Sequence, residues 1–170
     1  MVLRQTDTAP AAPSLKGARL LILEAPYYAH ITNPLAEAAL AVIAEAGGMA
    51  TRLAVPGALE LPQALAALVH ADRIGRFAGP DRKAFDGAVI IGCVIRGETT
   101  HYDTVVNEAN RGLMQLALRH GVPIGNALLT VENEAQAKSR ADGGTANKGG
   151  EAARACLALI AIERQFGLRS

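Results

Sequence analysis

The sequence contains no tryptophan, and aromatic residues make up only 4% of its 170 residues. This scarcity leaves few side chains on which nucleic-acid bases could stack. Positive charge is not in excess either, since 17 Lys and Arg residues stand against 16 Asp and Glu residues. The chain therefore lacks the basic surplus of a general nucleic-acid or anionic-membrane binder. Its longest apolar runs, such as 88–91, fall far short of the roughly 20 residues of a membrane-spanning helix.

Cysteine is also scarce, with Cys93 and Cys156 as the only two. Neither belongs to a CxxC pair or to a Cys/His spacing typical of zinc, so no metal is expected. Each is predicted to be a small buried apolar residue. The N-terminal stretch contains Pro10 and Pro13 but no apolar signal core, which predicts a cytoplasmic protein with a flexible arm over residues 1–16. This arm either has no role or becomes ordered on a neighbouring subunit.

The rest of the chain shows a regular alternation of apolar β-type runs and helical patterns. Strands are predicted at 19–25, 49–55, 86–94 and 123–131, and helices are predicted to begin near Asn33, Leu61, Asp103, Glu134 and Lys148. Such alternation favours parallel pairing through right-handed crossovers. We therefore predict an α/β fold with a single domain over residues 17–170. Its architecture would be a three-layer α/β/α sandwich around a four-stranded parallel sheet, with the most apolar strand at the centre.

Polar residues concentrate where the predicted strands end, which is the edge where parallel sheets bind ligands. The richest of these loops spans residues 96–102. It contains Gly97 for a tight turn and His101, which can move protons at the entrance of the next helix. The same loop could instead be a capping sequence with Asp103 as the helix N-cap. Arg96 could equally be a structural salt-bridge partner.

Four other side chains have both a ligand-binding and a purely structural interpretation. Glu60 could accept hydrogen bonds from a ligand or stabilise a helix N-terminus. Tyr27 could stack on a planar ligand or be a partly buried loop aromatic. Arg140 and Lys148 could clamp a phosphate or be solvated charges. They flank the glycine-rich stretch 143–150, which lacks the Gly-Lys-Ser/Thr order of a nucleoside-triphosphate loop.

Five segments together are more specific than any one of them: PGALELP at 56–62, GCVIRGETTHYD at 92–103, NE at 107–108, TVEN at 130–133 and NKGGEAA at 147–153. In this order and spacing they closely resemble the 6,7-dimethyl-8-ribityllumazine synthase family, from about Ala18 to Phe166. The resemblance implies a flavodoxin-like fold and a transferase of riboflavin biosynthesis. Such an enzyme condenses 5-amino-6-(D-ribitylamino)uracil with 3,4-dihydroxy-2-butanone 4-phosphate and releases phosphate and water. The resemblance implies that no cofactor or metal is needed.

The resemblance also implies a role for individual residues. His101 matches the proton-transfer residue, and Tyr27 matches the aromatic residue that stacks on the pyrimidine. Arg140 matches the phosphate-binding arginine, and Lys148 matches the basic residue near it. Substrate contacts are further implied for Ala58, Leu59 and Glu60 with the uracil and its ribityl chain, for Cys93, Val94 and Ile95 along the pyrimidine, and for Glu98 and Thr99 with the phosphate-bearing ketone.

Family members are homo-oligomers, which implies active sites between adjacent subunits of a pentamer, a decamer or a sixty-subunit shell. We expect a pentamer, in which the segment near residues 15–18 adds a strand to the neighbour's sheet. Asn126 departs from the family pattern, because many members carry there an aromatic residue that closes the neighbour's site. Tyr27 and Tyr28 replace a frequent Phe and a frequent Asn. Three alternatives stay open: a paralogue that binds lumazine or flavin without turnover, a container shell, and the archaeal riboflavin synthase that shares the fold.

Overall fold

A computed structural model of the chain describes residues 15–79, 81 and 83–168. Within these residues it contains strands β1 (Arg19–Glu24), β2 (Met49–Ala54), β3 (Gly87–Ile95) and β4 (Ile124–Val131). Its α-helices are α1 (Ala29–Glu45), α2 (Glu60–His70), α3 (His101–His120), α4 (Glu134–Ala141) and α5 (Lys148–Gln165). Two short 3-10 helices, η1 (Pro26–Tyr28) and η2 (Gly144–Ala146), complete the element order.

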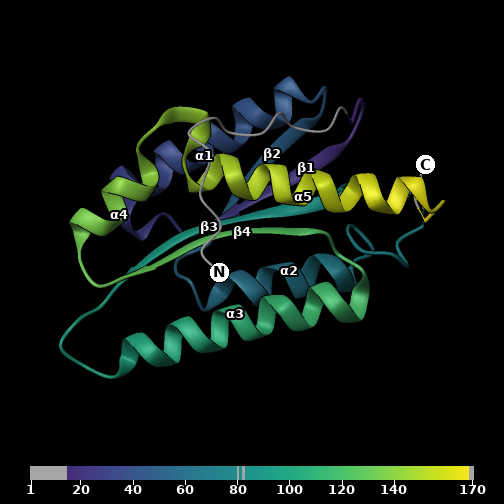
Figure 1. Cartoon of the computed structure of the whole chain (residues 1–170). Coiled ribbons are helices and arrows are strands. Elements are labelled where there is room, and N and C mark those ends of the chain that lie inside the picture. Colours follow the sequence, from purple (N-terminus) through teal and green to yellow (C-terminus); the bar gives the residue numbers. More distant parts are fainter. Residues whose placement is uncertain (1–14, 80, 82, 169–170) are drawn as a thin grey trace, which may run out of the picture.

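The four strands form one parallel sheet in the order β2-β1-β3-β4. Helices α1, α4 and α5 cover one face of this sheet, and α2 and α3 cover the other (Figure 1). This arrangement confirms the predicted three-layer α/β/α sandwich with a four-stranded parallel sheet. No helix among the described residues is long and apolar enough to cross a membrane.

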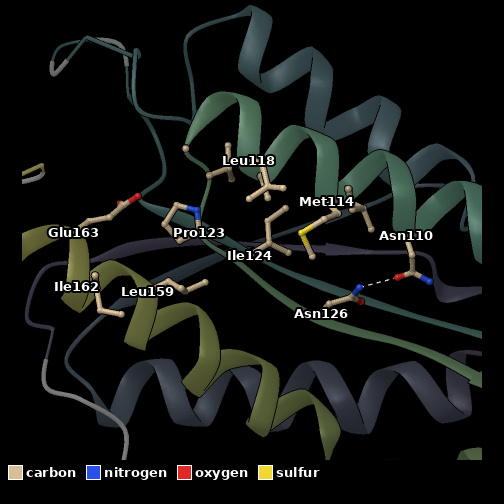
Figure 2. Close-up of a pocket in the computed structure, with 13 residues that line it drawn as sticks. Asn110, Met114, Leu118, Pro123, Ile124, Asn126, Leu159, Ile162 and Glu163 are labelled. Atoms are coloured by element: carbon tan, nitrogen blue, oxygen red, sulfur yellow. Dashed lines mark hydrogen bonds between the residues drawn. The ribbon is translucent and has the colours of Figure 1, made fainter.

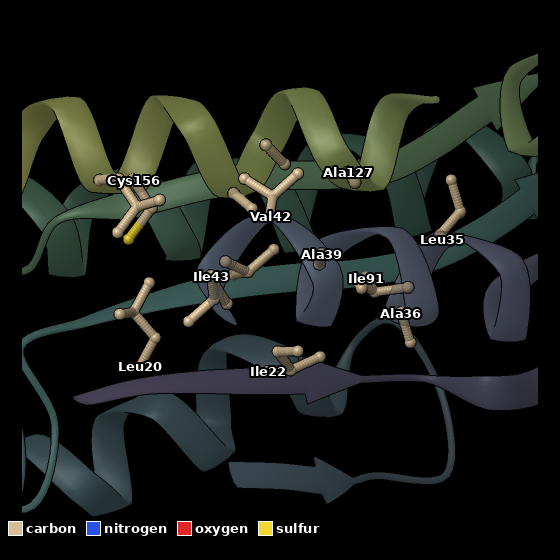
Figure 3. Close-up of a cluster of buried hydrophobic side chains, with 14 of the residues drawn as sticks. Leu20, Ile22, Leu35, Ala36, Ala39, Val42, Ile43, Ile91, Ala127 and Cys156 are labelled. Atoms are coloured by element: carbon tan, nitrogen blue, oxygen red, sulfur yellow. The ribbon is translucent and has the colours of Figure 1, made fainter. Parts of the chain in front are cut away.

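Two hydrophobic clusters, one on each face of the sheet, form the core. Alternate residues of a strand point to opposite faces, so Leu20 and Ile22 of β1 join the cluster under α1 and α5, while Leu21 and Leu23 join the cluster under α2 and α3. Figure 3 shows the first cluster, with side chains from β1, β3 and β4 meeting α1 and α5. Strand β3 lies between β1 and β4 and is buried over residues 87–93, which confirms its predicted place inside the sheet.

Helix α1 begins earlier than the sequence pattern predicts. It starts at Ala29 and contains Pro34 in its interior, so Asn33 is not its N-cap. Proline lacks the N–H that would bond to the carbonyl four residues back, and it is therefore expected only near a helix start. Tertiary packing overrides this preference, because Ile31 and Thr32 are fully buried and the Thr32 hydroxyl donates to the Tyr28 carbonyl at 3.3 Å.

The N-terminal arm predicted for residues 1–16 lies mostly outside the described residues. Its last part is attached to this chain's own core. Leu15 is buried, and its N–H donates to the Ala46 carbonyl at 2.8 Å. Ala18 is buried as well, and its carbonyl accepts the Met49 N–H at 2.8 Å. Residues 15–18 thus pack against this chain itself, and the predicted added strand is not formed there; residues 1–14 lie outside the described residues.

Helix α5 lies in direct backbone contact with two other elements. A Cβ added at Gly125 in β4 would lie 1.8 Å from the Ala152 carbonyl oxygen of α5. A Cβ at Gly149 in α5 would lie 2.0 Å from the Leu35 carbonyl oxygen of α1. Neither collision can be relieved by rotating a side chain, so both positions require glycine.

We therefore expect Gly125→Ala to lower the free energy of unfolding by about 3 kcal/mol or more, the upper end of the usual cost of overpacking. Gly79→Ala is the matched control, because a Cβ there meets no atom within 4 Å. Urea unfolding followed by circular dichroism, at one subunit concentration, compares the two variants. A Gly125→Ala protein as stable as the control would show that α5 does not touch β4 so closely.

Candidate active site

The loops that follow the four strands lie at one edge of the sheet, as the sequence predicts for a parallel arrangement. Figure 1 shows the loop from β3 to α3 and the loop from β4 to α4 at the same end of the molecule. Residues 26–28 follow β1 and form η1, and residues 56–59 lead from β2 into α2. This edge therefore collects residues that are far apart in the sequence.

His101 is the first residue of α3, directly after the turn that follows the central strand. The predicted alternative with Asp103 as N-cap is wrong, because the N-cap is Thr100 and Asp103 lies in the first turn. The imidazole is exposed and stands at the positive end of a 20-residue helix dipole. Glu98 and Thr99 are also exposed in the turn before it. The arrangement places a proton-transfer group beside a helix N-terminus that favours an anion.

Arg96 joins three of the elements at this edge, which confirms its interpretation as a salt-bridge partner. Its Nε donates to Glu132 Oε2 at 2.9 Å, and its Nη1 and Nη2 donate to Asp103 Oδ1 at 3.3 Å. The guanidinium carbon also lies 4.0 Å from the centre of the Tyr102 ring. The hydrogen bonds of Arg96 raise its pKa above the usual value. The bond to Asp103 has the largest effect, followed by the bond to Glu132.

The two tyrosines of η1 lie beside His30 of α1 and Glu134 of α4. Tyr27 is 76% exposed and packs edge-on against Tyr28, with ring centres 5.0 Å apart. Tyr28 also contacts His30 edge-on, and His30 Nε2 lies 2.9 Å from Glu134 Oε1. Burial is the largest cause that raises the Tyr28 pKa, followed by the nearby Tyr27, Cys93 and Glu134. The exposed face of Tyr27 is free to stack on a planar ligand.

Glu60 is the first residue of α2 and lies close to the turn before it. A Cβ at Gly57 would meet Glu60 Oε2 at 2.9 Å, and the Glu60 N–H donates to the Gly57 carbonyl at 3.2 Å. Ala58 and Leu59 are half-buried in this turn. A carboxylate in the first turn suits the helix dipole, and its position at the sheet edge also suits a ligand. Both interpretations of Glu60 therefore stay open.

The remaining predicted residues have other partners in the structure. Asn126 pairs in register with Ile90 in the middle of β3, five residues before the end of β4, which is about 16 Å along the strand. Its Nδ2 donates to Asn110 Oδ1 at 2.7 Å (Figure 2). Arg140, in the last turn of α4, donates through Nη1 to the Gln136 carbonyl at 2.9 Å. Lys148 opens α5 and pairs with Glu151 at 2.6 Å.

A groove of about 400 Å³ lies beside Asn126, between α3 and α5 and over the edge strand β4. Figure 2 shows Met114 and Leu118 of α3 facing Leu159 and Ile162 of α5 across it. All four side chains are at least 42% exposed, and Leu118 reaches 79%. Large contiguous apolar surfaces of this kind mark interaction sites.

Sequence reasoning missed the contacts that connect distant parts of the chain. Glu24 is a buried carboxylate at the end of β1, held by Arg52 of β2 through Nε at 2.9 Å and Nη2 at 2.8 Å. A glutamate near the end of the otherwise apolar run 20–25 was the available signal. Nothing local pointed to the pairing of His30 with Glu134, which lie 104 residues apart. Among the described residues, no cluster of His, Cys, Asp or Glu could hold a metal ion.

The family model for 6,7-dimethyl-8-ribityllumazine synthase matches residues 17–164. The chain is 48% identical over 155 residues to a protein of that name from Methylobacterium radiotolerans, covering 91% of this chain and 88% of the relative. It is 43% identical over 165 residues to its namesake from Azorhizobium caulinodans, covering 97% and 98%. A third relative of the same name, from Paramagnetospirillum magneticum, is 44% identical over 153 residues, covering 90% and 99%.

The four-stranded parallel sheet between two layers of helices is a flavodoxin-like α/β fold, and the family match places the chain among transferases. With the matches just given, the chain belongs to the 6,7-dimethyl-8-ribityllumazine synthase family. This membership confirms the resemblance derived from the sequence segments. The roles of individual site residues stay predictions.

The reactivity of the cysteine thiols provides a test of burial around Cys93 in β3. Both cysteines are buried, as predicted, and neither forms a disulfide. Burial raises the pKa of Cys93 to about 11. At pH 8 only about one such thiol in a thousand is a thiolate, against roughly a quarter of unperturbed thiols. We expect the native protein to react with Ellman's reagent far more slowly than the unfolded chain, and to react faster as pH rises toward 11. Equal rates in both states would contradict the burial of these thiols.

Proposed function

We propose that this chain is an active lumazine synthase that joins the ribitylamino-uracil to the four-carbon phosphate ketone. The observation that carries the proposal is the position of His101 at the N-terminus of α3, directly beyond the central strand. Family membership over residues 17–164 supports the same activity. A cytoplasmic location stays a prediction from the sequence.

The proposed chemistry needs proton transfer, charge stabilisation and orientation. A substrate amine attacks the ketone to form an imine and water, and the phosphate then leaves with the C–O bond electrons. His101 would shuttle protons in these steps. Arg140 and the N-terminus of α3 would stabilise the negative charge on the departing phosphate. Because amine and ketone react without a cofactor, holding them in register supplies much of the acceleration.

Different residues would recognise the pyrimidine, the ribityl chain and the phosphate of the two substrates. Tyr27 would stack on the pyrimidine, and Glu60 would accept hydrogen bonds from its N–H groups. The backbone beside Ala58 and Leu59, and beside Cys93, Val94 and Ile95, would line the ring and the ribityl chain. Glu98, Thr99, Arg140 and Lys148 would surround the phosphate.

We further propose that each site forms between two subunits of a homo-oligomer, with a pentamer as the expected state. Two observations support this proposal. Asn126 stands about 16 Å along β4 from the edge that holds His101, so it suits a neighbour's site better than its own. The apolar groove beside Asn126 exposes large side chains that a second copy would cover. Decamers and sixty-subunit shells would need a further contact between such pentamers.

A second candidate function is a protein that binds lumazine or flavin without turnover. Asn126 favours it, because its amide is already fixed by two hydrogen bonds. Its Nδ2 donates to Asn110, and its Oδ1 accepts the Leu128 N–H at 2.9 Å. An amide held in this way cannot cover a ring as an aromatic side chain does. Tight riboflavin binding by an assembled protein that forms no lumazine above the uncatalysed rate would support this alternative.

The shared site makes a sharp prediction for mixed assemblies. His101→Ala should lower kcat, and Arg140→Ala should raise KM for the phosphate ketone at least about tenfold, as expected for the loss of a charge-assisted hydrogen bond. We expect each site to take His101 from one subunit and Arg140 from its neighbour, so co-refolding the two variants in equal amounts places both intact residues at about a quarter of the subunit boundaries. Lumazine fluorescence should therefore recover to about a quarter of the wild-type rate. A mixture no more active than the average of the two variants would contradict the supply of His101 and Arg140 by different subunits.

The groove makes a separate prediction for assembly. Leu118→Glu would bury an uncompensated carboxylate under the neighbouring copy, which costs several kcal/mol. We expect this variant to sediment as smaller species and to lose activity with assembly. Phe77→Glu is the control, since Phe77 is 76% exposed and lies outside the groove. If Leu118→Glu assembled as the control does, the groove would not be a subunit contact.

A further inference from the structure

Three elements of the sheet edge meet at one guanidinium. Arg96 directly follows β3, Asp103 lies in the first turn of α3, and Glu132 directly follows β4. The side chain of Arg96 bonds to both carboxylates, and its backbone N–H donates to the Val131 carbonyl at 2.9 Å. We call this group, together with the Tyr102 ring 4.0 Å from the guanidinium carbon, the Arg96 clasp.

The clasp closes the turn that carries the proposed phosphate contacts. Residues 97–100 connect Arg96 to α3, and a Cβ at Gly97 would meet no atom within 4 Å. The turn is therefore positioned from its two ends. At one end Arg96 is anchored to Val131, and at the other the Asp103 N–H donates to the Thr100 carbonyl at 3.1 Å. The guanidinium links these ends directly.

The charges of the clasp matter as much as its geometry. One arginine and two carboxylates sum to a charge of −1. The positive charge of Arg96 is therefore already neutralised by Asp103 and Glu132 and is not available to bind an anionic substrate. Without it, two uncompensated carboxylates would stand beside the N-terminus of α3, where the phosphate of a substrate would bind. Arginine suits the position because its planar fork bonds to two acids and stacks on a ring, which lysine cannot reproduce.

We propose that Arg96 is a positioning residue. Through the clasp it holds the turn 97–100 and His101 in the geometry of the reaction, and it compensates Asp103 and Glu132 so that a phosphate can approach. This inference rests on the proposed function of the same site. The side chains of Arg96, Asp103 and Glu132 are 38%, 54% and 58% exposed, respectively. Ion pairs as exposed as these contribute little to stability. The clasp therefore acts on catalysis rather than on folding.

Three variants separate geometry from charge. Arg96→Met removes both the fork and the positive charge. Arg96→Lys keeps the charge without the fork. Arg96→Met combined with Glu132→Gln keeps the wild-type cluster charge of −1 and also lacks the fork. Circular dichroism, thermal unfolding and sedimentation of the assembled protein identify any variant that fails to fold or assemble.

For Arg96→Met we expect kcat to fall at least about tenfold, because small misplacements of a reacting group cost up to about a hundredfold in rate. KM for the phosphate ketone should rise, and KM for the pyrimidine should stay at the wild-type value. The lysine and double variants should restore KM for the ketone but not kcat. Wild-type kcat in all three variants, or equal changes in both KM values together with a lower unfolding temperature, would overturn the proposal.

Amide hydrogen exchange over residues 97–104 provides a readout that does not depend on activity. We expect faster exchange there in Arg96→Met than in the wild type, with α5 unchanged as the internal control. Unchanged exchange in the turn would overturn the positioning role. If the wild type formed no lumazine and the turn still exchanged faster in the variant, the proposed function and the catalytic effect of the clasp would fail, while its structural hold on the turn would be confirmed.

Discussion

The backbone contact of α5 with its neighbours is the constraint on which the rest of the structure depends. At Gly125 the strand β4 approaches Ala152 of α5, and at Gly149 the helix approaches Leu35 of α1, with no room for a Cβ at either place. These two contacts fix α5 relative to both the edge strand and the first helix. They therefore determine how deep the groove beside β4 is and which side chains of α5 face it.

The same constraint extends to the loop that carries the proposed phosphate residues. Asn147 is buried at the start of α5, and its Oδ1 accepts the N–H groups of residues 149 and 150 at 2.9 and 3.1 Å. Its Nδ2 donates to the Pro34 and Ala141 carbonyls. One amide thus connects α1, the end of α4 and the beginning of α5 with all four of its hydrogen bonds made. Arg140 and Lys148 flank this connection, so both cationic side chains start from rigid backbone.

The alternation of apolar runs was enough to predict the parallel sheet and the position of the polar edge, because burial on both faces leaves a strong local signature in β3. The predicted start of α1 was wrong because it depends on tertiary packing, which no local sequence pattern shows. The Asn33–Pro34 pair is a strong helix-start signal, but Ile31 and Thr32 are buried against the sheet and extend the helix upstream of it. Packing energy decided the boundary.

The candidate site shows the same division between local and distant information. His101 and Arg96 belong to one short segment, so their spacing along the chain predicted a common loop. The chain alone could not show that Arg96 pairs with Glu132, which lies 36 residues away. Nor could it show that Asn126 and Asn110 face each other from a strand and a helix. Such pairs depend on register and on the depth at which a helix packs, which are properties of the folded chain.

A reaction between two intrinsically reactive substrates asks little of an enzyme beyond register and a few well-placed charges. A sheet edge supplies one fixed wall for such a site, with His101 at a helix N-terminus. A second wall formed by Arg140 and Lys148 of another subunit would be equally fixed, because both residues start from the rigid connection around Asn147. In that arrangement the apolar groove beside Asn126 and the charged site are not separate features. Burial of the groove would provide the free energy that holds the two walls at the distance the chemistry requires.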